Sequence, residues 1–140
     1  MTETYFLDVN VLMYAAGQDH PYKQPCLRVL AAVEAGLLSV AVDAEIIQEL
    51  LYRYSNIGLT KQGVQLAFDL LAYHPSILPL GAPEIGLALE IFSQHHSQGV
   101  RPRDAFHAAA MLSNGLHRII SADRDFDHIQ GIARLDPHDL

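Results

Sequence analysis

Acidic residues follow short apolar runs at two places in this sequence. Asp8 stands inside the segment FLDVNVL, and Asp123 comes shortly after the run Arg118–Ser121, which reads RIIS. A carboxylate among apolar neighbours is costly to bury unless a hydrogen bond or a positive charge compensates it. Either these aspartates cap a helix or a turn, as Asp often does, or they belong to a site that binds a cation.

Two further acids stand on predicted helices. Asp104 lies in the first turn of RDAFHAAAML, where a carboxylate also suits the helix dipole. In the segment DAEIIQELLYRY, Glu49 borders the apolar stripe, whereas Glu45 falls nearly opposite its centre. We therefore expect Glu49 to reach a cleft and Glu45 to be solvated. The simpler alternative for Glu49 is an ion pair with Arg53, one helical turn away.

Composition limits the kinds of partner. The chain has 140 residues, with 16 acids against 9 Lys and Arg, and a net charge of −7. Phosphate binding normally comes from basic clusters, so a broad nucleic-acid-binding face is disfavoured unless the acids converge on divalent metal ions. The 8 histidines form no spaced metal-binding motif such as HExxH.

The same composition indicates a single globular domain over residues 1–140 that works in the cytoplasm. Cys26 is the one cysteine, so the chain forms no internal disulfide, as is usual in a reducing compartment. The start MTETYFLD lacks the features of a signal peptide, and the apolar runs are too short to span a bilayer. No membrane association is expected.

Strand-like and helix-like segments alternate along the chain. Strands are predicted at Thr4–Val9, Leu37–Val42, Ile77–Leu80, Arg118–Ser121 and Ile132–Leu135. Helices are predicted over Pro21–Ala35, from a cap at Asp43 to about Tyr54, over Thr60–Tyr73, from Pro83 to just before Gly99, and over Arg103–Ser113. The fold class is therefore α/β, a three-layer α/β/α arrangement with a central, mainly parallel sheet of four to five strands. Ligands of such sheets bind at the carboxyl ends of the strands, where Asp8 and Asp123 are expected.

Four segments together resemble the PIN domain family, and specifically the VapC-type toxin ribonucleases of toxin–antitoxin pairs. FLDVNVLMY is similar to the opening strand of the family with its D-x-N-x-L, and EIIQELLYR to the segment that carries its Glu. RDAFHAAAM matches the D-A-x-H-A-A helix start, and SADRDF matches the [TS]-x-D-x-x-F element. Each motif is weak alone, but four in order over essentially the whole chain are specific.

The resemblance assigns roles to individual residues. It implies a catalytic acidic cluster of Asp8, Glu49, Asp104 and Asp123, with Mg²⁺ or Mn²⁺ held by Asp8, Asp104 and Asp123. Asn10 and Ser121 fall at positions of polar supporting residues. Asp125 is a candidate outer ligand, while Asp125 and Asp127 together shape the turn that Phe126 anchors. The candidates for guiding the RNA backbone are Arg53, Arg101 and Arg103.

The resemblance also implies an activity and partners. It predicts metal-dependent hydrolysis of RNA phosphodiester bonds by a homodimer that a cognate antitoxin silences. Two other functions remain as alternatives. A phosphohydrolase with a nucleophilic Asp typically needs D-x-D after the first strand, but Asn10 follows Asp8 here. A non-catalytic PIN-fold module that binds RNA or protein would not need all four acids.

Overall fold

The computed structural model describes residues 3–140, and its strands form one parallel sheet. The strands are β1 (Thr4–Leu7), β2 (Ser39–Asp43), β3 (Ser76–Leu78), β4 (Arg118–Ile120) and β5 (Ala133–Leu135). They lie in the order β3-β2-β1-β4-β5, and every neighbouring pair is parallel. The predicted α/β class with a parallel central sheet is confirmed.

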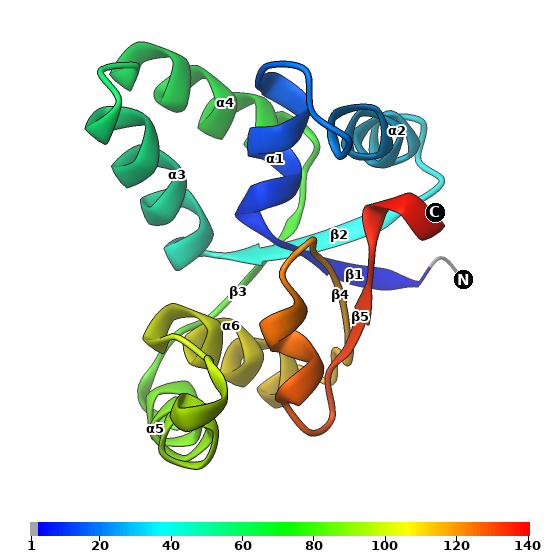
Figure 1. Ribbon diagram of the computed structural model, residues 1–140. Coiled ribbons are helices and arrows are strands. Elements are labelled where there is room, and N and C mark those ends of the chain that lie inside the picture. Colours follow the sequence, from blue (N-terminus) through cyan, green and yellow to red (C-terminus); the bar gives the residue numbers. More distant parts are fainter. Residues whose placement is uncertain (1–2) are drawn as a thin grey trace.

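Helices cover both faces of this sheet, and Figure 1 shows α1 to α4 on one side with α5 and α6 on the other. The helices of the described residues are α1 (Val9–Ala16), α2 (Lys23–Glu34), α3 (Ala44–Asn56), α4 (Thr60–Ala72), α5 (Ala82–His95) and α6 (Pro102–Ser113). Short 3-10 helices follow at η1 (His96–Gln98), η2 (Arg124–His128) and η3 (Pro137–Asp139). Within residues 3–140, no helix is both long and apolar enough to cross a membrane.

The core lies between the sheet and its two helix layers. The central strands β1, β2 and β4 contribute fully buried side chains to both layers, as a parallel sheet covered on both faces requires. On α6, four alanines are fully buried, namely Ala105, Ala108, Ala109 and Ala110. Their small side chains let α6 approach the sheet and α5 closely, which brings the first turn of α6 beside the strand ends.

The first strand ends earlier than the sequence predicts. β1 stops at Leu7, and Val9 begins α1 instead of ending the strand. The cause is Asp8, whose carboxylate accepts a hydrogen bond from the backbone N–H of Val9 and so caps α1. Residues 10–16, for which the sequence predicted neither a strand nor a helix, therefore belong to this helix. The other predicted boundaries differ from the observed ones by about one to three residues, within the usual uncertainty of helix and strand ends.

The strand order brings three carboxyl ends together. β1 lies between β2 and β4, so the residues that follow these strands meet at one edge of the sheet. Those residues are Asp8 after β1, Asp43 at the end of β2 and Ser121 after β4. The backbone N–H of Asp8 also donates to the carbonyl of Ile120, which fixes the two strand ends side by side.

Candidate active site

All four predicted acids line one hollow of about 180 Å³ at this edge of the sheet. Asp8 comes from the end of β1, Glu49 from α3, Asp104 from the first turn of α6, and Asp123 from the start of η2. Asp8, Glu49 and Asp104 are buried, and Asp123 is partly exposed. The structure thus brings together four acidic side chains that stand far apart in the sequence.

Asp8 is held rigidly by hydrogen bonds to both carboxylate oxygens. Oδ1 accepts from the backbone N–H of Val9 at 2.8 Å, and Oδ2 accepts from the Ser121 hydroxyl at 2.6 Å and from the Asn10 amide at 3.2 Å. Burial nevertheless raises the pKa of Asp8 above its ordinary value, because these bonds only partly replace water. The carboxylate therefore caps α1 and also lines the hollow.

Asn10 and Ser121 connect Asp8 to Asp123, as expected for supporting residues. The Asn10 amide donates to the Ser121 hydroxyl oxygen at 3.1 Å, and its carbonyl accepts from the backbone N–H of Ala122 at 3.3 Å. The same hydroxyl oxygen accepts from the backbone N–H of Asp123 at 2.9 Å. These bonds fix the loop after β4 against β1.

Asp104 lies close to other acidic side chains, which disfavour its ionised form. Burial is the main cause that raises the pKa of its carboxyl to about 6, and the neighbouring Asp123 and Asp8 raise it further. The backbone N–H of Arg101 donates to Asp104 at 3.2 Å and lowers the pKa only in part. A divalent cation among these side chains would favour their charged forms.

Glu49 is the acid that already has positive neighbours. Its Oε2 lies 2.9 Å from an Arg53 guanidinium nitrogen and 3.1 Å from one of Arg103. Burial alone would raise the pKa of Glu49, but His107, Arg53 and Arg103 outweigh it and lower the pKa. The i,i+4 pair with Arg53 therefore exists, and Glu49 also reaches the hollow, as its position beside the apolar stripe predicts.

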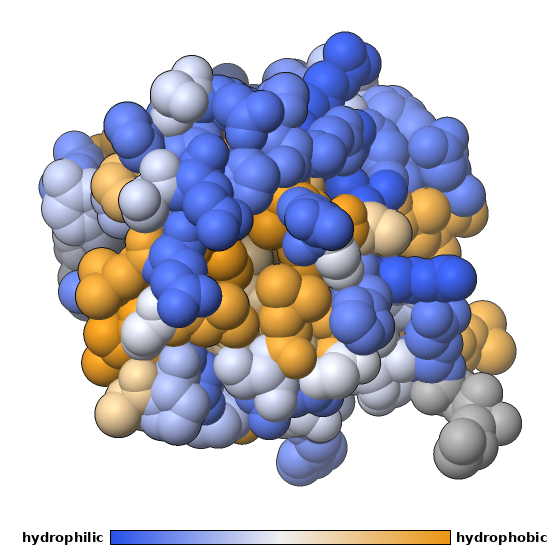
Figure 2. All heavy atoms as spheres, turned by 90° about the horizontal axis from the view of Figure 1, so that it is seen from below, coloured by the Kyte–Doolittle hydropathy of each residue, from blue (hydrophilic) through white to orange (hydrophobic). Residues whose placement is uncertain are grey.

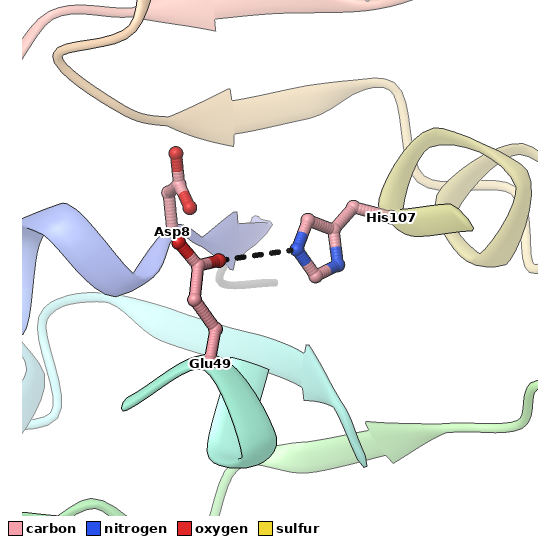
Figure 3. A group of neighbouring side chains, drawn as sticks. All are labelled: Asp8, Glu49 and His107. Carbon is pink, nitrogen blue, oxygen red and sulfur yellow. Dashed lines mark ion pairs between the residues drawn. The ribbon is translucent and has the colours of Figure 1, made fainter. Parts of the chain in front are cut away.

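A buried histidine completes the group and was given no role from the sequence. His107 of α6 is 1% exposed, and its Nδ1 lies 2.8 Å from Oδ2 of Asp43. Figure 3 shows its ring beside Asp8 and Glu49. Its Nε2 points toward Glu49, 4.0 Å from Oε1, and has no hydrogen-bond partner within residues 3–140. Burial alone would lower the pKa of His107, but Asp43 and Glu49 raise it to about 10. His107 therefore lies buried between the carboxylates of Glu49 on α3 and of Asp43, the cap of α3, and both carboxylates favour its protonated form.

The position of His107 relative to Asp104 indicates that its side chain faces the site, which a count of histidines does not show. His107 stands three residues after Asp104, so one turn of α6 carries both side chains toward the strand ends. Asp43 was predicted only as a helix cap, and it does cap α3, with Oδ1 accepting from the backbone N–H of Ile46 at 3.1 Å. Its other oxygen holds His107, which no local pattern could show.

The remaining predicted residues lie in four different settings. Asp127 forms an ion pair with Arg134 at 2.9 Å and Phe126 is fully buried, so both stabilise the turn as expected. Asp125 donates its backbone N–H to Asp123 Oδ1, but its own side chain does not line the acidic hollow. Arg101 is exposed at the rim of the hollow. Glu45 is partly buried where α6 passes α3, not fully solvated as the helical phase predicts.

The donor set fits a hard divalent cation. The four acids offer carboxylate oxygens, which Mg²⁺ and Mn²⁺ prefer as ligands in proteins. Burial is the main cause that raises the pKa of Asp8 and of Asp104, and a cation bound beside them would favour their ionised forms. This buried acidic cluster is therefore compatible with divalent-metal binding.

The family follows from comparison with known proteins. A family model described as PIN domain matches residues 5–132. Ribonuclease VapC13 of Mycobacterium tuberculosis is 33% identical over 130 residues, which are 92% of this chain and 97% of that protein. The chain therefore belongs to the PIN domain family, and its relatives there are VapC ribonucleases.

Solved structures show the same fold. The chain matches VapC20 of Mycobacterium tuberculosis, described as a toxin that cleaves the sarcin-ricin loop, with a TM-score of 0.75 and 15% identity, over 93% of this chain and 98% of that one. It also matches a toxin–antitoxin complex from Klebsiella pneumoniae with a TM-score of 0.66 and 15% identity, over 97% and 99%. At these identities the likeness concerns the fold alone.

Proposed function

We propose that this protein is a VapC-type ribonuclease that hydrolyses RNA phosphodiester bonds with Mg²⁺ or Mn²⁺. The observation that carries the proposal is the convergence of Asp8, Glu49, Asp104 and Asp123 on one hollow, in a chain whose relatives are named ribonucleases. When bound there, the metal ion supplies Lewis-acid stabilisation of the phosphate and a water of lowered pKa. Asp8, Asp104 and Asp123 are the residues proposed to hold it.

The other site residues position these acids and the RNA. Asn10 and Ser121 orient the Asp8 carboxylate through their hydrogen bonds. Glu49, whose pKa is lowered by His107, Arg53 and Arg103, stays ionised and can orient a water molecule in the hollow by accepting its hydrogen bond. Arg53 and Arg103 hold Glu49 from the rim, where an incoming RNA phosphate would meet their guanidinium groups.

The proposal also includes an antitoxin. A toxin–antitoxin complex is among the structures that share this fold, which supports a protein partner for this chain as well. An arginine of such a partner could pair with the same carboxylates that bind the metal and so silence the enzyme. A cytoplasmic location would place the protein with both its RNA substrate and its antitoxin.

The geometry disfavours the two alternatives. A phosphohydrolase with a nucleophilic Asp typically needs D-x-D after the first strand, but here Asn10 takes the second position and its amide donates to Asp8 Oδ2. A non-catalytic module has no use for three buried acids around one hollow, because their mutual repulsion destabilises the fold.

Cleavage of an RNA pool tests the proposal. We expect Asp8→Asn and Glu49→Gln each to abolish Mn²⁺-dependent cleavage, while Glu90→Gln, an exposed acid on α5, retains it. Asp8→Asn should fold normally, because Asn caps helices as well as Asp does. Full activity in folded Asp8→Asn, or cleavage that persists in EDTA, would contradict the assignment.

A further inference from the structure

A second hollow adjoins the acidic one along α3 and α6. It has a volume of about 390 Å³ and is lined by Glu45, Arg101, Pro102, Arg103 and Phe106, which we name the α3–α6 groove. Arg101 and Arg103 line both hollows, so the groove begins where the acidic site ends. An RNA strand whose phosphate lies at the acids would therefore place a neighbouring nucleotide in the groove.

The groove contains charged side chains of opposite sign that do not form ion pairs with one another. Glu45 forms no ion pair within residues 3–140, although two arginines line the same hollow. With the Gln48 amide nitrogen turned toward it, the carboxylate accepts from that nitrogen at 2.9 and 3.0 Å, and each oxygen keeps a second lone pair for a ligand. Arg103 pairs with Glu49 instead, and the Arg101 guanidinium has no carboxylate partner in the described part of the chain. A ligand that fits here needs an anionic part for Arg101 and hydrogen-bond donors for Glu45.

An unpaired nucleotide meets both needs and also fits the apolar residues. Phe106 is partly buried and lines the groove beside Pro102, which gives a flat apolar surface on which a base can stack. Single-stranded RNA is typically recognised by such stacking and by hydrogen bonds to the Watson–Crick edge of the base. The phosphate would then lie at Arg101, and the base edge would face the Glu45 carboxylate.

The Glu45 carboxylate favours one of the four bases over the others. An ionised carboxylate only accepts hydrogen bonds, and its two oxygens match two adjacent donors. Guanine presents such a pair, N1–H and the N2 amino group. On the same edge adenine and cytosine each present a donor beside an acceptor, and uracil presents its donor between two acceptors. An acceptor opposite Glu45 is repelled, so guanine is the base that fits.

We propose that the α3–α6 groove is a guanine-selective subsite for the nucleotide next to the cleaved bond, with Glu45 as the residue that selects the base. This inference rests on the proposed ribonuclease function but concerns binding, so it is tested without cleavage. It identifies the substrate class as single-stranded RNA with guanine beside the cleavage site.

The experiment measures binding of labelled five-nucleotide RNAs to the Asp8→Asn protein in EDTA, where no hydrolysis interferes. The probes are UUGUU, UUAUU, UUCUU, UUUUU and UUIUU, in which inosine lacks only the N2 amino group of guanine. We expect UUGUU to bind about fivefold or more tighter than the adenine, cytosine and uracil probes, as one bidentate contact provides, and inosine to be intermediate.

Two variants made in the Asp8→Asn protein separate the base contact from general affinity. Glu45→Gln should remove the preference for guanine, whereas the matched charge change Glu90→Gln on the exposed face of α5 should keep it. Phe106→Leu should weaken binding of all five RNAs alike. Equal affinity for all probes, or a guanine preference that survives Glu45→Gln, would overturn the subsite. Loss of cleavage in the wild type with the binding preference intact would instead overturn the proposed function alone.

Discussion

At the scale of single residues, the defining feature of the site is the burial of its carboxylates. Asp104 is 5% exposed, and burial together with Asp123 and Asp8 raises the pKa of its carboxyl to about 6. The unfolded chain keeps the ordinary pKa of 3.8. Between these two values the folded protein binds more protons than the unfolded one, so its stability falls as the pH rises through this window.

The fall in stability with rising pH gives a prediction for Asp104→Asn in the absence of metal. The shift of about two pKa units corresponds to roughly 3 kcal/mol of stability that the wild type loses between about pH 4 and pH 6. Asn cannot ionise and can still accept the hydrogen bond from the Arg101 backbone, so the variant should lack this loss. Urea unfolding in EDTA at several pH values compares the two proteins. Unfolding free energies that change in parallel with pH would contradict the raised pKa.

Some residues of this site could be predicted from the sequence, and others could not. Asp8 and Asp123 follow predicted strands, Glu49 borders a helical stripe and Asp104 lies in a first helical turn. Only the resemblance to the PIN domain family joined these four acids into one predicted cluster. His107 could not be given a role, since its meaning depends on Asp43, a residue 64 positions away. The partial burial of Glu45 depends likewise on the path of α6 beside α3.

At the scale of elements, the site depends on how closely neighbouring helices pack. α4 crosses α3 at Gly63, where an added Cβ would lie 2.7 Å from the Cβ of Tyr54. The neighbouring atom belongs to a side chain that is almost fully buried and is fixed to the helix backbone, so it cannot move away cheaply. Because α3 carries Glu49, a shift of α3 would also displace this acid.

We therefore predict opposite effects for two glycine substitutions in helices. Gly63→Ala should lower the free energy of unfolding by about 1 to 3 kcal/mol, as overpacking does. Gly86→Ala on α5 adds a Cβ that meets no atom within 4 Å, and it should stabilise the protein by about 0.5 to 1 kcal/mol through helix propensity. Chemical denaturation measures both. Equal changes in the two variants would mean that α3 and α4 do not pack as described.

The order of elements followed from the sequence, whereas their ends did not. Apolar runs and turn residues predicted a mainly parallel sheet of four to five strands, and the structure has five strands, all parallel. The predicted end of β1 was wrong because Asp8 caps α1 and so ends the strand at Leu7. The strand order, which makes β1, β2 and β4 neighbours, follows only from long-range packing.

At the scale of the whole molecule, apolar side chains gather on the α5 side of the protein. Figure 2 looks onto this side and shows them as an orange area. The exposed apolar residues of β3 and α5 include Ile77 at 56%, Ile85 at 43% and Leu89 at 61%. Exposed apolar patches commonly mark protein–protein contacts. We expect this face to form the predicted homodimer.

A single charge tests that expectation. Leu89→Glu would bury a carboxylate at the centre of the proposed contact, so the variant should sediment as a monomer at concentrations where the wild type is a dimer. Glu90→Gln, its exposed neighbour on the same helix, serves as the control and should stay dimeric. A wild type that is monomeric at every concentration, or a dimer unaffected by Leu89→Glu, would contradict the interface.

The measurement that tests the central claim most directly is thermal unfolding with Mn²⁺, with Mg²⁺, and with NaCl at matched ionic strength. An ion that binds only the folded state at a hundredfold excess over its Kd stabilises the protein by about 2.7 kcal/mol. With an unfolding entropy of about 2.1 cal/mol/K per residue, this should raise the Tm of the 140-residue chain by roughly 9 °C. Asp8→Asn should lose most of the shift. Identical melting curves in Mn²⁺, Mg²⁺ and matched NaCl, at metal concentrations well above millimolar, would contradict the claim that these four acids form a metal-dependent catalytic site.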